Sequence, residues 1–119
     1  RYDRYLNSVD FIQKYIFPGG CLPSSGAIVG SVGRATDMHV THVEDFAEHY
    51  ARTLQYWRER FESNLDAIRD LGMTDDFLRM WTYYLCYCEG AFREKKIGVS
   101  QWLLQKPGNR RSPCFPALG

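Results

Sequence analysis

Three histidines and three carboxylates crowd one short run of this sequence, and with four cysteines they are the first candidates for metal chemistry. The run is HVTHVEDFAEHY, residues 39–50, and the cysteines lie at positions 21, 86, 88 and 114. The run lacks an H-E-x-x-H order and crosses an expected strand end and helix start, so its side chains should scatter. The cysteines lack zinc-type pairing, and Cys86 and Cys88 point to different sides of an expected helix. We therefore expect no metal site, reduced thiols, and acids at 44–48 that cap a helix.

A single phenol, Tyr50, stands at the start of the strongest helical pattern. A phenol hydroxyl can donate a hydrogen bond to an anion and orient it without giving up its own proton. In the first turn of a helix, Tyr50 would also hold such an anion near the positive end of the helix dipole. Periodicity alone favours the simpler alternative, in which the Tyr50 ring anchors the helix start against a core.

Two sets of large apolar side chains share helix faces. Each set follows a spacing of four residues, which places its members one above another: Tyr50 with Leu54, and Tyr84 with Cys88 and Phe92. Such faces either line an apolar cavity or pack as a core, and the aromatic content of 15% fits both. Four further residues are offset from these faces and are assigned to the core: Trp57, Phe61, Trp81 and Leu85.

The first third of the chain predicts short, interrupted elements. Residues 3–17 fit a short helix or two broken turns, and Pro18 forces Phe17 out of helical geometry before the Gly19-Gly20 joint. Ser24 or Ser25 then caps a helix to about residue 35, and residues 38–46 form a strand.

The rest of the chain predicts two long helices and a strand. A continuous apolar stripe indicates one helix from His49 to a stop at Gly72. Thr74 caps a second helix through residue 96, and residues 97–105 form the last strand. Two strands joined by two long helices suit one end of an α/β sheet, because a free two-stranded sheet is only marginally stable.

Composition narrows the class of protein. The 119 residues are 45% hydrophobic and 24% charged with a net charge of +1, which is the balance of a soluble globular domain without a nucleic-acid surface. No apolar run reaches the roughly 20 residues that span a bilayer. The chain opens at Arg1 without an initiator Met, so we expect an upstream segment to precede it.

Four segments together resemble one family. FIQKYIFPGGCLPS, HYARTLQYWRERF, MWTYYLCYCEGAFR and IGVSQWLLQKP resemble, in order and spacing, the C-terminal part of the cyclopropane-fatty-acyl-phospholipid and mycolic acid cyclopropane synthases. The resemblance covers residues 1–107. It implies the C-terminal portion of a Rossmann-like class I S-adenosylmethionine-dependent methyltransferase, an α/β fold. This family transfers a methyl group to a cis double bond of a phospholipid acyl chain and closes a cyclopropane ring.

The resemblance also implies roles for seven residues. Tyr50 matches the family's bicarbonate-binding tyrosine, and six positions match the wall of its acyl tunnel: Phe17, Leu22, Leu54, Tyr84, Cys88 and Phe92. Residues 1–23 would form a lid with Pro18-Gly19-Gly20 as its hinge, 24–47 a helix and strand, 48–96 the two long helices, and 97–106 the last strand. Residues 108–119 would form a disordered tail. The family's Gly-rich cofactor turn has no counterpart here, so we expect no cofactor-binding residue in this chain and no activity from it alone.

The resulting hypothesis is a fragment of a lipid methyltransferase of the cytoplasm, peripheral at the inner membrane face, using S-adenosylmethionine and bicarbonate. Its partner would be an unsaturated phospholipid acyl chain, with no nucleic acid. One alternative is a sister enzyme that leaves a methyl branch or a hydroxyl group. The other is a non-catalytic lipid-binding or dimerising module, since an exposed strand edge and apolar helix face favour a homodimer or domain exchange. The cations of REKK, residues 93–96, are assigned to solvated surface, with a weak attraction to anionic headgroups as the alternative.

Overall fold

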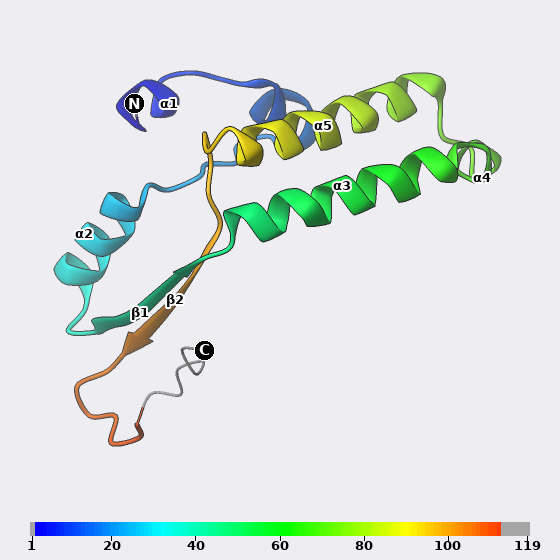
Figure 1. The fold of residues 1–119 in the computed structure, drawn as a ribbon. Helices are drawn as coiled ribbons and strands as arrows, with labels where there is room; N and C mark the ends of the chain where they lie inside the picture. The colour runs from blue at the N-terminus through cyan, green and yellow to red at the C-terminus, as the bar shows by residue number, and fades with distance from the viewer. Residues whose placement is uncertain (1, 113–119) are drawn as a thin grey trace. The chain divides into compact units, whose positions relative to one another are not determined.

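The structure, a computed structural model, describes residues 2–112 of the chain. Its elements are α1 (Tyr2–Leu6), the π-helix η1 (Ile12–Ile16), α2 (Ser25–Ala35), β1 (His39–Asp45), α3 (Ala47–Ser63), α4 (Leu65–Asp70), α5 (Asp75–Arg93) and β2 (Ser100–Gln105) (Figure 1). These residues divide into two compact units, of which the first comprises residues 2–42 and 102–112 and the second residues 43–101. Each unit is described by itself.

The first unit opens with two short helical turns, as the sequence predicts. Asp10 and Gln13 bond reciprocally just before and within η1: the Gln13 N–H donates to Asp10 Oδ1 at 2.8 Å, and the Asp10 N–H donates to Gln13 Oε1 at 3.0 Å. Phe17 leaves helical geometry, with φ −129° and ψ 76°, before Pro18. Gly19 then takes φ +79°, a conformation in which a Cβ would be strained, and this completes the expected turn.

The helix α2 and the two-stranded sheet also follow the sequence. The Ser24 hydroxyl accepts a hydrogen bond from the Ala27 N–H at 3.1 Å, which confirms the expected cap of α2. β1 pairs with β2. The Thr41 hydroxyl donates to Leu103 O at 3.1 Å and the Phe46 N–H to Val99 O at 2.8 Å, so the strands run antiparallel.

The second unit is built on α3 and α5, which lie side by side along their length (Figure 1). We call α3, α4 and α5 together the helical hairpin. The Thr74 hydroxyl accepts from the Phe77 N–H at 3.2 Å and caps α5, as expected. Gly72 ends the preceding helical segment with φ +88°, which also agrees with its predicted role as a stop.

One predicted helix is in fact two. The apolar stripe from Tyr50 to Ile68 indicates a continuous helix, but α3 ends at Ser63 and α4 begins at Leu65. The intervening Asn64 has φ −120° and ψ 20°, and its side-chain amide donates to Arg60 O at 2.7 Å. Asparagine competes in this way with the backbone for helix carbonyls, and hydrophobic spacing does not detect it.

The last strand begins later than predicted. β2 starts at Ser100 and not at Ile97, because the chain first turns after α5. Lys95 takes φ +51°, and the Lys96 N–H donates to Ala91 O at 2.9 Å, which is a left-handed helix end. Glycine usually occupies such a position, so the lysine there gives no sequence signal of the turn.

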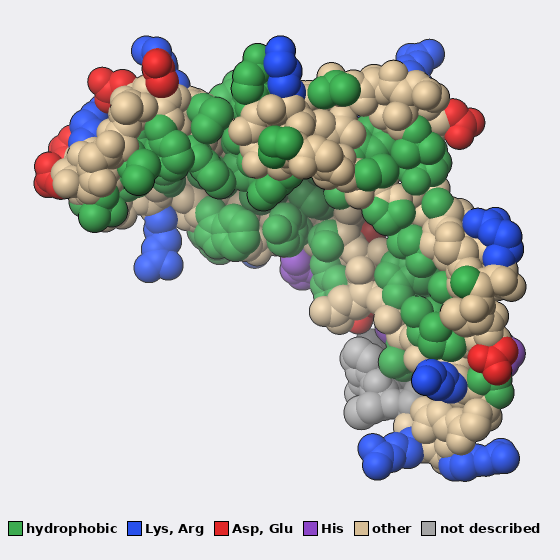
Figure 2. Space-filling view, turned by 180° about the vertical axis from the view of Figure 1, so that it is seen from behind, with side chains coloured by type: hydrophobic (Ala, Val, Ile, Leu, Met, Phe, Trp, Pro, Cys, Tyr) green, Lys and Arg blue, Asp and Glu red, His purple; other side chains and the backbone are tan. Residues whose placement is uncertain are grey.

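Among residues 2–112, the buried hydrophobic side chains all lie on the helical hairpin: Ala51, Leu54, Leu78, Leu85, Cys88 and Phe92. Of the four predicted core residues, Leu85 is confirmed at 5% exposure, while Phe61 and Trp81 are half-buried. The prediction for Trp57 is wrong, because half of its surface is exposed. Figure 2 shows that hydrophobic side chains also reach the surface of the hairpin between its charged groups.

A polar clamp holds α3 against α5. Glu89 accepts hydrogen bonds from Arg58 Nε of α3 at 3.2 Å and from Arg93 Nε of its own helix at 2.9 Å. Arg93 also donates to Gln55 Oε1 of α3 at 2.8 Å. Burial alone raises the pKa of Glu89, but the hydrogen bonds from Arg93 and Arg58 outweigh it and hold that pKa below its ordinary value.

Replacing Glu89 by Gln should therefore destabilise the protein by about 1–2 kcal/mol, because the carboxylate serves two guanidinium groups. Glu62, whose side chain is 41% exposed, offers a control. Glu62→Gln should cost less than about 0.5 kcal/mol in urea unfolding. Since the folded pKa of Glu89 is lowered, its stabilisation is complete above the ordinary value of 4.5 and is lost as pH falls through the folded pKa. Equal losses of stability in the two variants would contradict the stabilising role proposed for Glu89.

The described part of the chain ends in a turn after β2, where the Asn109 N–H donates to Lys106 O at 2.9 Å. The predicted tail, residues 108–119, falls mostly on residues 113–119, which lie outside the described residues together with Cys114. Within residues 2–112, none of the helices combines the length and the apolar character needed to cross a bilayer.

Candidate functional site

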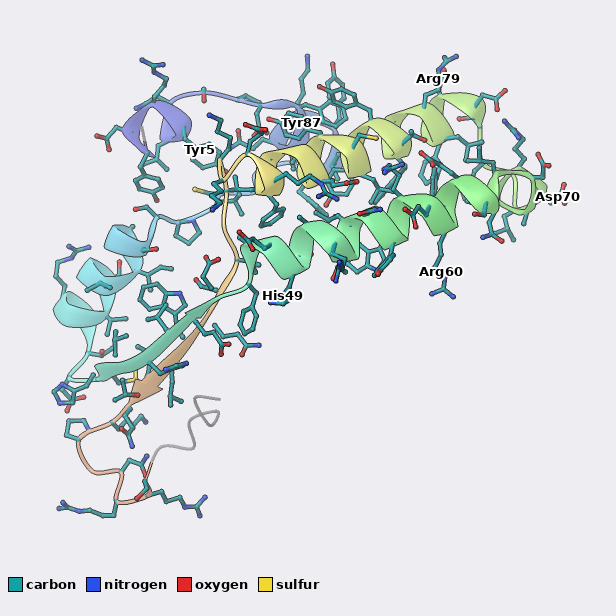
Figure 3. All side chains as sticks on the ribbon, viewed as in Figure 1. Tyr5, His49, Arg60, Asp70, Arg79 and Tyr87 are labelled. Carbon is teal, nitrogen blue, oxygen red and sulfur yellow. The ribbon has the colours of Figure 1, made fainter. Side chains whose placement is uncertain are left out.

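The phenol of Tyr50 lies in the first turn of α3, as predicted. The Tyr50 N–H donates to Phe46 O at 2.8 Å, and the Asp45 carboxylate accepts from the Ala47 N–H at 3.0 Å at this helix start. Asp45 is one of the acids expected to cap the helix. It binds the first N–H of α3 from the position before the N-cap residue Phe46, whose own side chain makes no capping hydrogen bond. Figure 3 shows the neighbouring His49 at the same end of α3.

The Tyr50 ring joins the two long helices. Its centroid lies 5.0 Å from that of Phe92 on α5, and 6.1 Å from that of Trp57, which meets it edge-on at 78°. Phe92 is 7% exposed, while Tyr50 itself is half-buried. The phenol therefore stands at the border of a packed aromatic cluster.

A second phenol, Tyr84, faces the same cluster from α5. Burial raises the pKa of Tyr84 to about 12, and the neighbouring Cys88 and then the charge of an ionised Tyr50 add to the effect. Tyr84 lies one helical turn before Cys88 on α5, and its ring meets that of Trp81 edge-on with the centroids 5.2 Å apart. Tyr84 thus remains a neutral hydrogen-bond donor at physiological pH.

Five of the seven predicted site residues come together on the helical hairpin. Tyr50 and Leu54 belong to α3, and Tyr84, Cys88 and Phe92 to α5. The other two, Phe17 and Leu22, belong to the first unit, where they are 55% and 58% exposed. Their place in a wall shared with the hairpin stays a prediction, and so does a lid over residues 1–23.

Three of the five residues on the hairpin are part of its core. Leu54, Cys88 and Phe92 are 2%, 6% and 7% exposed. None of the three hollows described below is lined by them. Helix–helix packing is therefore sufficient to explain their burial, and burial alone does not make them a tunnel wall.

The sequence-based assignment missed Trp57 as a neighbour of the site. Its offset from the Tyr50–Leu54 face indicated the core, yet its ring lies against Tyr50 and half of it is exposed. The available signal was the spacing of seven residues between Tyr50 and Trp57, which is two helical turns.

Three hollows open on the second unit. One of about 370 Å³ is lined by Glu48, His49, Arg52, Gln55 and Arg93. A second of about 460 Å³ shares Glu48 and His49 with it and is completed by Asp45, Ala47, Lys95, Lys96, Ile97 and Gly98. The third, of about 620 Å³, lies between α4 and α5 and is lined by Leu65, Arg69, Asp75, Leu78, Arg79, Thr82, Tyr83 and Cys86.

Metal ligands are not assembled in the part of the chain that the structure describes. Across residues 2–112, no three His, Cys, Asp or Glu side chains are grouped to hold an ion. Cys21, Cys86 and Cys88 are reduced thiols, of which Cys88 is buried.

Comparison with known proteins gives one consistent family. The family described as mycolic acid cyclopropane synthetase matches residues 2–102. The tuberculostearic acid methyltransferase of Mycobacterium tuberculosis is 45% identical over 98 residues, covering 82% of this chain and 23% of that protein. The cyclopropane-fatty-acyl-phospholipid synthase of Escherichia coli is 41% identical over 99 residues, covering 81% of this chain and 24% of that protein.

A solved structure agrees with these relatives. The mycolic acid cyclopropane synthase CmaA1, crystallised with SAH and CTAB, superposes with a TM-score of 0.77 at 32% identity, over 88% of this chain and 35% of that one. The α/β fold, expected as a portion of a Rossmann-like methyltransferase, is confirmed by this likeness.

The chain spans about a quarter of the length of the curated relatives it matches. The family model nevertheless covers nearly all of the described residues. The protein therefore belongs to the mycolic acid cyclopropane synthetase family.

Proposed function

We propose that the intact protein transfers a methyl group from S-adenosylmethionine to the double bond of an unsaturated phospholipid acyl chain and closes a cyclopropane ring. In this proposal the chain described here supplies part of the acyl-binding wall and the tyrosine that holds bicarbonate. In this proposal the reaction takes place at the inner face of the membrane, to which the enzyme binds peripherally from the cytoplasm.

One observation carries the proposal: a half-buried phenol stands at the edge of an apolar helix pair in a member of this family. Tyr50 meets Phe92 at 5.0 Å, and Trp57, half of which is exposed, continues the aromatic surface beside the Tyr50 ring. A chain of methylenes lying on such a surface gains about 0.8 kcal/mol for each methylene removed from water.

The chemistry assigns Tyr50 a positioning role. Methyl addition leaves a positive charge on the alkene carbons, and ring closure then releases one proton from the added methyl group. Bicarbonate, when bound, would supply the base for that proton. The Tyr50 hydroxyl fits this base because it can donate a hydrogen bond, and because it lies at the positive end of the α3 dipole. The neutral Tyr84 is a second donor within the same cluster.

The described residues do not fit a cofactor site. Three glycines, Gly26, Gly30 and Gly33, lie within α2 and not in a turn between a strand and a helix. No residue of this chain is therefore assigned to S-adenosylmethionine, whose site we place elsewhere in the intact protein.

A methyl branch is the second candidate product. The relative at 45% identity is named a tuberculostearic acid methyltransferase, whereas the one at 41% is named a cyclopropane synthase. Both products begin with the same methyl transfer, so the roles proposed for the hairpin residues apply to either reaction.

Product analysis tests the proposal. The intact protein, incubated with S-adenosylmethionine and phospholipid vesicles rich in monounsaturated chains, should give fatty acids that each carry one added carbon. Mass spectrometry of the released methyl esters detects the added carbon. Ozonolysis then separates the outcomes, because a cyclopropane ring withstands it, whereas the methylene branch that methyl transfer and proton loss give is an alkene and is cleaved. A ring product supports the proposal and a branch supports the second candidate. Unchanged fatty acids with a protein that binds S-adenosylmethionine would overturn both.

A further inference from the structure

We propose that the open end of the helical hairpin carries a binding site for the phosphate of an anionic phospholipid headgroup. The site spans two adjoining hollows that share His49: Arg52 and Arg93 line one of them, and Lys95 and Lys96 line the other. We call the two together the basic hollow. It rests on the proposed function, because it gives the substrate lipid a second point of attachment next to Tyr50.

The first argument is charge. The two adjoining hollows at the start of α3 are lined by four cations, Arg52, Arg93, Lys95 and Lys96, against two carboxylates, Asp45 and Glu48. Local sequence shows only the cations of residues 93–96. The fold brings Arg52, about 40 residues earlier in the sequence, next to Arg93. Cations that are distant in sequence therefore line one hollow.

The second argument is that only some of these cations have hydrogen-bond or ion-pair partners within the protein. Lys95 pairs with Glu48 at 3.6 Å, and Arg93 is held by Glu89 and Gln55. Across residues 2–112, by contrast, Arg52 and Lys96 make no side-chain hydrogen bond or ion pair. The clamp therefore fixes Arg93 as one wall of the hollow, while two neighbouring cations keep their donors available for an anion.

The third argument is position. His49 and Arg52 line the hollow, and Tyr50 lies between them in sequence but points to the other side of α3, toward Phe92. A phosphate in the basic hollow and an acyl chain beside the Tyr50 ring would thus contact the same end of α3 on two sides. A hollow of about 370 Å³ is large enough for a phosphate group with its ester oxygens.

The hairpin offers matched control residues. Arg60 on α3 and Arg79 on α5 are exposed cations of the same two helices, and Figure 3 shows them pointing away from the hairpin near its closed end. A double variant Arg60→Gln/Arg79→Gln removes the same charge as Arg52→Gln/Lys96→Gln from a different place.

Flotation of the intact protein with vesicles tests the site. We expect Arg52→Gln/Lys96→Gln to weaken binding to phosphatidylcholine vesicles containing phosphatidylglycerol by on the order of tenfold. Arg60→Gln/Arg79→Gln should weaken it less than about twofold, and the charge-conserving Arg52→Lys/Lys96→Arg should restore binding. Unchanged binding by Arg52→Gln/Lys96→Gln, or an equal loss in the Arg60 and Arg79 variant, would overturn the proposal.

Two further measurements keep the outcomes distinct. If inorganic phosphate shifts the His49 ring resonances at millimolar concentration while vesicles bind equally to both double variants, the hollow takes free phosphate and the headgroup assignment is wrong. If the vesicle result holds but no lipid is methylated, the headgroup site stands and the proposed function fails. Matching melting temperatures of the two double variants exclude misfolding as the cause of lost binding.

Discussion

Replacing Tyr50 by Phe in the intact protein is expected to lower kcat for lipid methylation by about 10²-fold, with little change in KM for the lipid. The substitution removes one hydroxyl and leaves the ring, so the contacts with Phe92 at 5.0 Å and Trp57 at 6.1 Å persist. What is lost is the donor that would orient the base. Steady-state kinetics on vesicles of a monounsaturated phospholipid measure both constants.

Tyr56→Phe is the matched control, because Tyr56 lies on the same helix with 55% of its surface exposed and should tolerate the change. A bicarbonate titration adds a readout that packing would not move. Turnover by the wild type should rise with bicarbonate in buffers freed of carbon dioxide, and turnover by Tyr50→Phe should not respond. A variant that keeps kcat and loses lipid binding would assign Tyr50 to packing.

The local elements were predictable because their signals are local. Ser24 and Thr74 cap α2 and α5 through the hydroxyl contacts that their positions indicate. The interruptions were not predictable from spacing alone. Asn64 breaks a continuous apolar stripe by taking a helix carbonyl, and Lys95 turns the chain in a conformation normally left to glycine. Both depend on one side chain or one backbone angle, which hydrophobic periodicity averages away.

The candidate site shows the same division. Helical spacing put Tyr84, Cys88 and Phe92 on one face of α5, and Phe92 of that face meets Tyr50 of α3 at 5.0 Å. It did not tell a cavity wall from a core, because both require apolar side chains at the same spacing. It also left Arg52 unassigned, since a cation acquires its partners only when α3 and the end of α5 are brought together.

Leu54→Trp is expected to abolish most lipid methylation while leaving affinity for S-adenosylmethionine unchanged. Leu54 is 2% exposed and lies one helical turn from Tyr50, so a larger ring has no free volume there and must displace its neighbours toward the acyl-binding face. Overpacking of this kind costs about 1–3 kcal/mol of stability. Activity on long-chain phospholipid and calorimetric cofactor binding, measured on one preparation, separate a blocked lipid site from a damaged protein.

Two companion variants distinguish a wall residue from a core residue. Leu78→Trp places the same overpacked side chain in the same hairpin core, at a leucine that is 4% exposed and lies near α4, away from Tyr50. It should lose similar stability and keep lipid methylation. Leu54→Met, which nearly conserves volume, should retain both within about 1.5 kcal/mol of stability. Parallel loss of activity in both Trp variants would make Leu54 a packing residue, because the effect would then follow stability and not position along the acyl chain.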